Sequence, residues 1–250
     1  MSNEDNVYDN WKNMCKHIVS NKITDWKQDK NVTYMLEHLG QEYAEIYLQN
    51  LLNEGVNIYN IQKLCEINDK YGNANIKQFN NGLRSSTSSI RYVRHALDIC
   101  NLIKSKNYKK VNIVEVGGGY GGLCVILNNL ANTMNISISK YFIYDLEEIQ
   151  RLQHYYLCNF INIDNVRFKS SNTFGSNFIT EDGEVNILVS CYCLSEIKDE
   201  YKNEYLKNLL PKVHGGFLAW NFGNKEGLPK EATIVPEIPD TGEGNTIITW

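Results

Sequence analysis

Apolar side chains recur at three- and four-residue steps through much of the first hundred residues, which is the spacing of an amphipathic helix. One such pattern covers residues 36–51, and a second covers residues 58–67 and stops near Gly72. A third predicted helix spans about residues 90–104, and the serines just before it offer N-caps. The polar segment 78–84 between these helices is typical of a loop.

From residue 111 the pattern changes to short runs of branched and aromatic residues that alternate with helical stretches. These runs predict strands, at residues 111–116, 141–144, 166–168, 185–190 and 216–221. The predicted helices between them lie at residues 123–134, 147–159 and 201–210. Two last runs, 232–235 and 246–249, are separated by Pro236, Pro239 and the glycines at 242 and 244, as in a long hairpin.

Strand–helix alternation of this kind produces parallel strands with helices on both faces of a sheet. We therefore expect an α/β fold, in which a doubly wound, seven-stranded, mostly parallel sheet follows an N-terminal helical cap. The predicted division places the cap, a substrate-side region, at residues 1–106 and the sheet domain at residues 107–250.

Composition and charge exclude several classes of function. The 25 Lys and Arg residues against 29 Asp and Glu give a net charge of −4, which argues against a general nucleic-acid binder. No apolar run is long enough to span a membrane, and the acidic, polar residues 1–10 do not form a secretory signal. The seven cysteines, an odd number without a CxxC pair, indicate buried thiols in a reducing compartment. We expect a cytoplasmic protein.

The strongest chemical signal is the sequence Glu115-Val-Gly117-Gly-Gly119-Tyr-Gly121 at the end of the first predicted strand. A strand that enters such glycines must turn tightly and bring its backbone close to a ligand. That ligand would lie at the carboxyl end of the strand, beside the N-terminus of the next helix. The string Gly117-x-Gly119-x-x-Gly122 also satisfies the dinucleotide pattern, and a bare match also occurs in purely structural turns, so the glycines alone leave the cofactor open.

Asp145, at the end of the second predicted strand, narrows the choice. An acid there can accept hydrogen bonds from both hydroxyls of an adenosyl ribose, which nicotinamide cofactors and S-adenosylmethionine both carry. Three features favour S-adenosylmethionine. A long helical region precedes the glycine strand, a hairpin closes the sheet, and little chain remains for a separate catalytic domain.

With these residues the chain resembles the class I S-adenosylmethionine-dependent methyltransferases, whose first motif matches Glu115-x-Gly117-x-Gly119-x-Gly121. More narrowly, it is similar to the sugar O-methyltransferases of polysaccharide-synthesis loci, over about residues 55–250. Further segments carry that similarity, namely Ile90-Arg-Tyr-Val-Arg-His95, Tyr144-Asp-Leu146, Tyr192-Cys-Leu-Ser-Glu-Ile197 and Gly216-Phe-Leu-Ala-Trp-Asn221. The resemblance implies a Rossmann-like methyltransferase fold, with S-adenosylmethionine as cofactor and S-adenosylhomocysteine as its product.

The resemblance also implies cofactor contacts after each of the first four strands. The glycines would pass under the methionine part, Asp145 would hold the ribose and Leu146 would pack on the adenine. The residues after the third strand would meet the adenine edge, although the common Asp is missing there, and those after the fourth would line the route to the sulfonium. The implied contacts are Glu115, Gly117, Gly118, Gly119, Asp145, Leu146, Asn172, Thr173, Cys191 and Tyr192.

Methyl transfer to an alcohol requires an aligned acceptor oxygen and a base that removes its proton. Glu196, a few residues after the fourth strand, is the first candidate base, because desolvation can raise the pKa of a Glu toward neutrality. Its alternative role is to cap the helix that begins near Lys198. His95, on the helix that resembles the substrate-side segment, is the second candidate base, and its alternative role is packing.

Arginines near His95 are candidates for binding an anionic group. Guanidinium forks suit a carboxylate or a diphosphate, such as the cofactor's methionine carboxylate or the phosphates of a sugar nucleotide. Arg91 is favoured over Arg94 because it shares a helix face with His95. With Asn221 from the last matching segment, the predicted substrate-binding residues are Arg84, Arg91 and Asn221.

The leading hypothesis is an S-adenosylmethionine-dependent O-methyltransferase that acts on a sugar hydroxyl, in a nucleotide sugar or a glycan, during polysaccharide or glycan biosynthesis. The alternatives are a methyltransferase with a non-sugar acceptor, a nicotinamide-dependent oxidoreductase and a non-catalytic binding module. No residue pattern requires a metal, since ribose binding and a helix N-terminus explain the acids at 145, 147 and 148. A homodimer is left open.

Overall fold

The computed structural model describes residues 3–160, 163–242 and 244–250, and the side chains of residues 3–7 and 163 are not described. Met1 and Ser2 of the polar N-terminus and Glu243 of the predicted hairpin lie outside these residues.

The chain forms two compact units that interleave along the sequence. The first comprises residues 1–97, 119–130 and 146–163, and the second comprises residues 98–118, 131–145 and 164–250. The predicted boundary at 106/107 stays a prediction.

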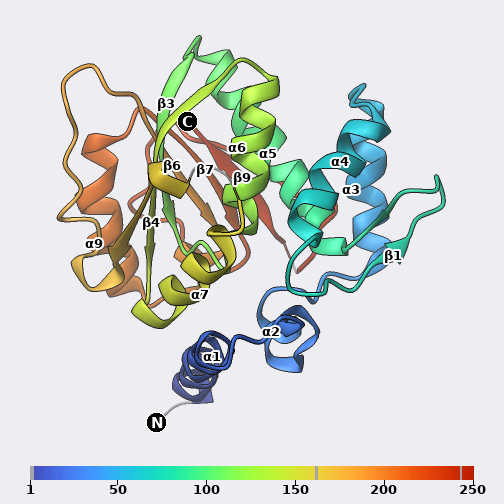
Figure 1. Cartoon of the computed structure of the whole chain (residues 1–250). Helices are drawn as coiled ribbons and strands as arrows, with labels where there is room; N and C mark the ends of the chain where they lie inside the picture. The colour runs from blue at the N-terminus through green and yellow to red at the C-terminus, as the bar shows by residue number, and fades with distance from the viewer. Residues whose placement is uncertain (1–2, 161–162, 243) are drawn as a thin grey trace. The chain divides into compact units, whose positions relative to one another are not determined.

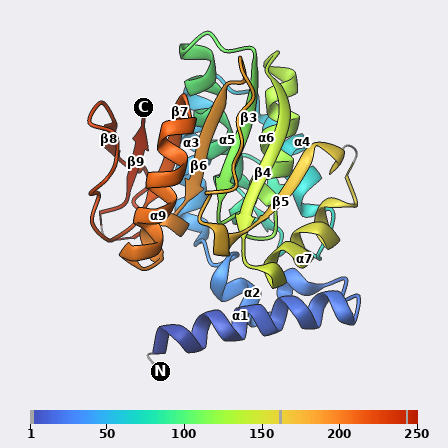
Figure 2. The same cartoon turned by 90° about the vertical axis from the view of Figure 1, so that its left-hand side faces the viewer.

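The second unit is built on a mixed sheet. Within the described residues its strand order is β5-β4-β3-β6-β7-β9-β8, with every pair parallel except β7–β9 and β9–β8 (Figure 2). The strands are β3 (Lys110–Val116), β4 (Ser137–Asp145), β5 (Val166–Ser170), β6 (Asn186–Cys191), β7 (Gly215–Trp220), β8 (Thr233–Pro236) and β9 (Thr246–Thr249). The predicted doubly wound, seven-stranded, mostly parallel sheet with its closing hairpin is confirmed.

α-Helices precede β3 and connect β3 to β4, β4 to β5 and β6 to β7, as the alternating pattern predicted, whereas none connects β5 to β6 within the described residues. They are α5 (Thr87–Ser105) before β3, then α6 (Gly122–Thr133), α7 (Glu147–Leu157), α8 (Cys193–Glu196) and α9 (Asp199–Leu209). Strand β4 begins four residues before its predicted start at 141, because Ser137 pairs with Lys110 at the polar beginning of β3. Ile136 and Ile138 alternate with Ser137 and Ser139 just before residue 141, a strand signal that the prediction left out.

One face of the sheet packs against α9 (Figure 1). Tyr205, Leu206 and Leu209 of this helix lie in one buried cluster with side chains of five strands. The strand residues in that cluster include Val114, Phe142, Leu188, Leu218, Trp220 and Ile248. The strands are apolar on both faces because parallel strands are buried on both sides.

The helical N-terminal region predicted from the sequence is present in the first unit. Its helices are α1 (Asn3–Ser20), α2 (Lys30–Met35), α3 (Gln41–Asn53) and α4 (Ile58–Asp69), and α1 lies beside α7 (Figure 2).

The single helix predicted over residues 36–51 is wrong at its start. Leu36 is the C-cap of α2, and Gly40, in an extended conformation, is the N-cap of α3. Leu39 lies between the two helices and is buried without being helical, which explains the misleading spacing.

The predicted loop at 78–84 is the turn of a small hairpin, in which β1 (Lys77–Gln78) pairs with β2 (Arg84–Ser85). Buried thiols were predicted throughout, but Cys158 is exposed at the end of α7, and Cys191 and Cys193 are only partly buried. In the part of the chain that the structure describes, we find no helix long and apolar enough to cross a membrane.

A buried lysine organises the core of the first unit. Lys27 is 1% exposed, and its ammonium donates to the backbone oxygen of Asn68 at 2.8 Å. It also lies 4.5 Å from the ring centre of Tyr120 and 5.1 Å from that of Tyr156, at the distance of cation–π contacts. Desolvation lowers the pKa of Lys27. Tyr120 of the glycine motif is therefore a core side chain.

Candidate functional site

The candidate site lies at the carboxyl ends of β3, β4 and β6. From β3 the sheet continues to β4 and β5 on one side and to β6 and β7 on the other, so the strand order reverses between β3 and β6. Open α/β sheets bind ligands at such a switch point. Ser190 ties the two strand ends together, because its hydroxyl donates to the carbonyl oxygen of Val116 at 2.8 Å and accepts the N–H of Leu194 at 3.2 Å.

Gly117 and Gly118, which we call the glycine turn, follow β3 directly. Gly117 has a φ of +78°, a backbone conformation that favours glycine. A Cβ atom at Gly117 would lie 2.2 Å from the Cβ of Cys193, the first residue of α8. Close packing of β3 against α8 therefore requires glycine here, independently of any ligand.

Asp145 ends β4 beside the glycine turn. Its side chain is buried, with 9% exposed, and its Oδ2 accepts the N–H of Gly118 at 3.0 Å. The N–H of Gly117 in turn donates to the carbonyl oxygen of Tyr144 at 3.0 Å. The structure thus brings together the predicted ribose-binding acid and two of the predicted cofactor glycines.

Gly119 and Leu146, the next residues along the chain, belong to the first unit. The carbonyl oxygen of Gly119 accepts Nε2 of Gln153 at 2.9 Å. A Cβ atom on Gly119 would lie 3.3 Å from a methyl group of Leu36. Leu146 is the half-buried N-cap residue of α7. Their predicted cofactor contacts stay predictions.

Glu115 of the first motif is a core residue of β3. It is 2% exposed, and its Oε2 accepts the hydroxyl of Tyr141 at 3.0 Å. Burial raises the pKa of Glu115 to about 8, the nearby Asp145 charge adds to this, and the Tyr141 hydrogen bond opposes it. Glu115 therefore holds a proton near neutral pH and pairs with a strand neighbour.

The raised pKa of Glu115 should make the stability of the protein depend on pH. At pH values between the ordinary Glu pKa of 4.5 and the folded-state pKa of about 8, the folded protein holds a proton on Glu115 that the unfolded chain has lost. The free energy of unfolding should therefore fall by about 1.4 kcal/mol per pH unit in this window from this group alone. We expect Glu115→Gln to remove that slope, measured by urea unfolding at several pH values.

The control for this experiment is Glu231→Gln, which changes an exposed carboxylate and should keep the wild-type slope. Equal slopes in the wild type and Glu115→Gln would show that Glu115 is ionised in the folded protein.

On the β6 side of the switch point, Cys191 ends the strand and Tyr192 follows it. Tyr192 has a φ of +70°, and its hydroxyl donates to Oε1 of Glu237 at 2.7 Å. Glu237 follows β8 and is 1% exposed, and its Oε2 accepts Nδ2 of Asn245 at 3.0 Å. Sequence reasoning missed Glu237 and Asn245. Both are polar residues at the two ends of the predicted hairpin connection, and this position was the sequence signal that could have identified them.

Glu196 and Asn221 are also brought together. Oε1 of Glu196 accepts Nδ2 of Asn221 at 2.7 Å, and the hydroxyl of Ser195 donates to Oδ1 of Asn221. Glu196 is the exposed last residue of α8, so the expected desolvation is wrong and its role as base stays a prediction. The capping alternative is also wrong, because Lys198 is the N-cap residue of α9.

Asn172 and Thr173 lie in η3 (Ser171–Thr173), a short 3-10 helix after β5. Asn172 is exposed, whereas the hydroxyl of Thr173 donates to the carbonyl oxygen of Ser170 at 2.8 Å. The Thr173 hydroxyl therefore serves its own turn, and contact of these residues with an adenine edge stays a prediction.

The predicted substrate-side residues Arg84, Arg91 and His95 belong to the first unit. Arg91 and His95 are buried on α5, and His95 packs edge-to-face on Tyr47. Arg84 is exposed in β2. Arg94 is buried as well and forms a 2.6 Å ion pair with Glu54. Burial therefore does not distinguish Arg91, which shares a helix face with His95, from Arg94.

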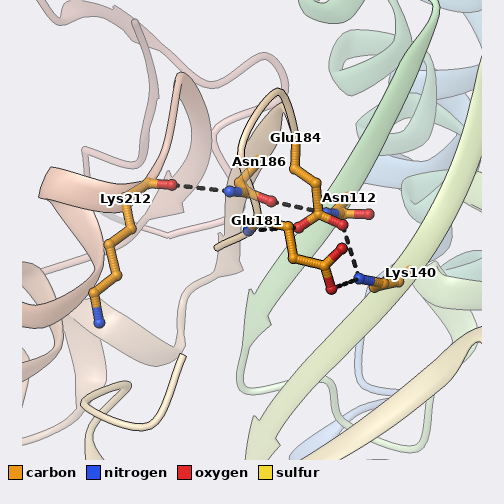
Figure 3. Close-up of polar contacts among 6 residues, drawn as sticks. All are labelled: Asn112, Lys140, Glu181, Glu184, Asn186 and Lys212. Carbon is orange, nitrogen blue, oxygen red and sulfur yellow. Dashed lines mark hydrogen bonds and ion pairs between the residues drawn. The ribbon is translucent and has the colours of Figure 1, made fainter. Parts of the chain in front are cut away.

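A shallow polar cleft lies at the opposite, amino edge of β6 and β7, lined by residues 180–184 and 211–214. Beneath it, Nδ2 of Asn112 donates to Oδ1 of Asn186 at 2.9 Å, and Nδ2 of Asn186 donates to the carbonyl oxygen of Lys212 (Figure 3). Lys140 pairs with Glu181 and Glu184 at 2.9 and 2.7 Å (Figure 3). These polar groups pair with one another and tie the strand beginnings together.

Among the residues described, no three His, Cys, Asp or Glu side chains are grouped to hold a metal ion.

The geometry defines an open, doubly wound α/β sheet with a glycine turn and an acid at its switch point. No family model and no curated protein matches the chain. Similar solved structures include the methyltransferase domain of a bacterial CtHen1, with 12% identity and a TM-score of 0.45 over 64% of this chain and 97% of that one. M. capricolum TrmK, solved in complex with S-adenosylhomocysteine, has 14% identity and a TM-score of 0.43, over 62% of this chain and 65% of TrmK.

The mitomycin 7-O-methyltransferase MmcR has 9% identity and a TM-score of 0.43, over 66% of this chain and 55% of MmcR. Similarities at this level assign neither a family nor a substrate to the chain.

Proposed function

We propose that this protein is an S-adenosylmethionine-dependent methyltransferase that methylates a sugar hydroxyl. The observation that carries the proposal is the buried carboxylate of Asp145, bonded to the N–H of Gly118 beside the left-handed Gly117. A carboxylate at the end of the second strand is placed to accept ribose hydroxyls. A glycine turn beside it leaves backbone accessible to the tail of the same cofactor.

The strand order supports a cofactor with one nucleoside. Dinucleotides bind across two parallel βαβαβ halves that form one continuous parallel sheet. Here the antiparallel strand β9 occupies the position next to β7, where the last parallel strand of the second half would lie. The sheet therefore has one complete nucleotide-binding half, which fits S-adenosylmethionine better than a nicotinamide dinucleotide.

A sugar acceptor is supported by the side chains at the carboxyl edge of β7. Asn221 and Glu196 form a hydrogen-bonded pair, and Glu196 is exposed. The ring of Phe222, next to Asn221, is 61% exposed. Amide and carboxylate groups can pair with hydroxyls, and an aromatic face can stack on the apolar face of a sugar ring. A phenol acceptor would use the same ring and fewer of the polar groups.

The roles we propose follow the order of the strands. The glycine turn and Gly119 carry the methionine part of the cofactor, Asp145 binds the ribose, and Leu146 packs on the adenine. Cys191 and Tyr192 line the approach to the sulfonium. S-adenosylmethionine supplies an activated methyl group, and the chain aligns the acceptor oxygen with it and removes the acceptor proton.

The test is a calorimetric titration of the purified protein with S-adenosylhomocysteine, with thermal unfolding as a second readout. We expect micromolar binding and a raised melting temperature, because a ligand that binds only the native state stabilises it. NAD should give neither effect. Response to NAD without response to S-adenosylhomocysteine would support the oxidoreductase instead.

The sugar assignment is tested separately with methyl-labelled S-adenosylmethionine and two acceptor panels, nucleotide-linked hexoses and simple phenols. Label in the phenols alone would keep the methyltransferase and reject the sugar.

A further inference from the structure

Tyr192 follows β6 at the switch point, where the proposed function expects the approach to the sulfonium. Residues on both sides of Tyr192 contact the end of β3, since Ser190 donates to the carbonyl oxygen of Val116 and Cys193 packs against Gly117. The backbone of Tyr192 is held in the left-handed region, with its N–H donating to the carbonyl oxygen of Ala219 at 2.7 Å. Non-glycine residues in this conformation are uncommon and occur where the surroundings impose them, often at functional sites.

The tyrosine hydroxyl is directed to a buried carboxylate. Glu237 accepts this hydroxyl at 2.7 Å with Oε1 and the amide of Asn245 at 3.0 Å with Oε2. Two donated hydrogen bonds, one to each oxygen, suit an ionised carboxylate, because that form only accepts. The backbone N–H of Glu237 also donates to the carbonyl oxygen of Asn245 at 2.9 Å, which fixes the two residues relative to each other.

Asn245 is equipped to pair with Glu237 in either protonation state. Its side chain is 4% exposed, and its Oδ1 is buried without a hydrogen-bond partner among the described residues. A buried acceptor left unpaired is unfavourable. If the amide reverses, Oδ1 takes the place of Nδ2 and can accept a proton from a protonated Glu237. Asn245 thus provides a donor to the carboxylate and an acceptor for the acid.

We propose that Tyr192 and Glu237 form a proton relay that removes the acceptor's hydroxyl proton during methyl transfer. This inference rests on the proposed function. The carbon–sulfur bond of the sulfonium breaks, its electron pair stays on sulfur, and the acceptor oxygen bonds to the methyl carbon. The acceptor proton passes to the oxygen of Tyr192 as the Tyr192 proton passes to Glu237. Tyr192 is then the catalytic residue and Glu237 a positioning residue that acts through it.

The first test follows turnover with methyl-labelled S-adenosylmethionine and a mixture of UDP-, GDP- and dTDP-linked hexoses. We expect Tyr192→Phe and Glu237→Gln each to lower kcat about a hundredfold or more, the range of general-base catalysis. The KM for S-adenosylmethionine should change little. The double variant should be no slower than either single variant, because the two residues act as one unit. Glu237→Asp should recover part of kcat.

The matched control is Glu231→Gln, the same substitution at an exposed residue just before β8, which should keep wild-type turnover. Wild-type kcat in Glu237→Gln would overturn the relay. So would a loss confined to Glu196→Gln, since the proton would then go to Glu196. A purely structural brace would instead lower the melting temperature of Tyr192→Phe and leave kcat nearly unchanged.

A second measurement needs no acceptor. The infrared difference spectrum between the wild type and Glu237→Gln at neutral pH reports whether Glu237 is ionised in the resting protein. We expect the carboxylate band, and a protonated carboxyl band would overturn the relay. Binding of S-adenosylhomocysteine to Glu237→Gln, measured alongside, separates the two proposals. If the wild type does not bind S-adenosylhomocysteine, the proposed function is rejected. If Glu237→Gln binds S-adenosylhomocysteine and keeps full turnover, the relay alone is rejected.

Discussion

Gly117→Ala is expected to destabilise the protein by roughly 3 kcal/mol or more, the range reached when a substitution combines strain with overpacking. The new Cβ would lie 2.2 Å from the Cβ of Cys193, so the start of α8 must move away from β3. The φ of +78° adds strain of its own. For a chain of this size the melting temperature should drop by roughly 6–12 °C. Thermal and urea unfolding would measure the loss.

The matched control is Gly183→Ala, since Gly183 has a φ of +80° and open space where a Cβ would lie. It carries the backbone strain without the clash and should lose only about 1 kcal/mol. Adding Cys193→Gly to Gly117→Ala should restore part of the loss. Equal losses in Gly117→Ala and Gly183→Ala would mean that contact with Cys193 does not decide the residue at 117.

Asp145→Ala should weaken the binding of S-adenosylhomocysteine by roughly 1–3 kcal/mol, which is about 5- to 150-fold in Kd. Two effects combine in this variant. The proposed ribose hydroxyls lose their acceptor, and the N–H of Gly118 loses the partner that holds the glycine turn. Asp145→Asn keeps one carbonyl oxygen for that N–H and should bind with intermediate affinity. Calorimetry on the folded variants gives these affinities directly.

Asp182→Asn serves as the control, because Asp182 is an exposed acid at the opposite edge of the sheet. It should bind S-adenosylhomocysteine like the wild type. Unchanged affinity in Asp145→Ala would place the ribose elsewhere, even if the cofactor itself binds.

The strands of the second unit were predictable because burial on both faces makes parallel strands nearly continuous apolar runs. The apolar pattern misled the helix prediction at Leu36 and Leu39. Their spacing fits a helix, although Leu36 only ends α2 and Leu39 lies in the turn before Gly40. Burial produces apolar spacing in compact turns as well as in helices, and only the three-dimensional structure distinguishes them.

The candidate site was predictable where it depends on local sequence, as at Gly117 and Asp145. Glu196 shows the limit of that reasoning, because the burial of a residue at the end of a one-turn helix depends on packing that its neighbours do not encode. Glu237 shows a second limit. Its contact with Tyr192 spans 45 positions and exists only because β9 inserts between β7 and β8.

The position of β9 has a consequence for the order of events during synthesis. β8 leaves the ribosome before β9, yet in the described sheet β8 pairs only with β9, and its residues are exposed. β8 therefore stays unpaired until residues 246–249 have been synthesised. Until they emerge, β7 is an open edge with its backbone groups available to other chains. A nascent chain that stalls before residue 246 would leave this edge of an otherwise nearly complete sheet unpaired, and unpaired strand edges make such intermediates prone to aggregate.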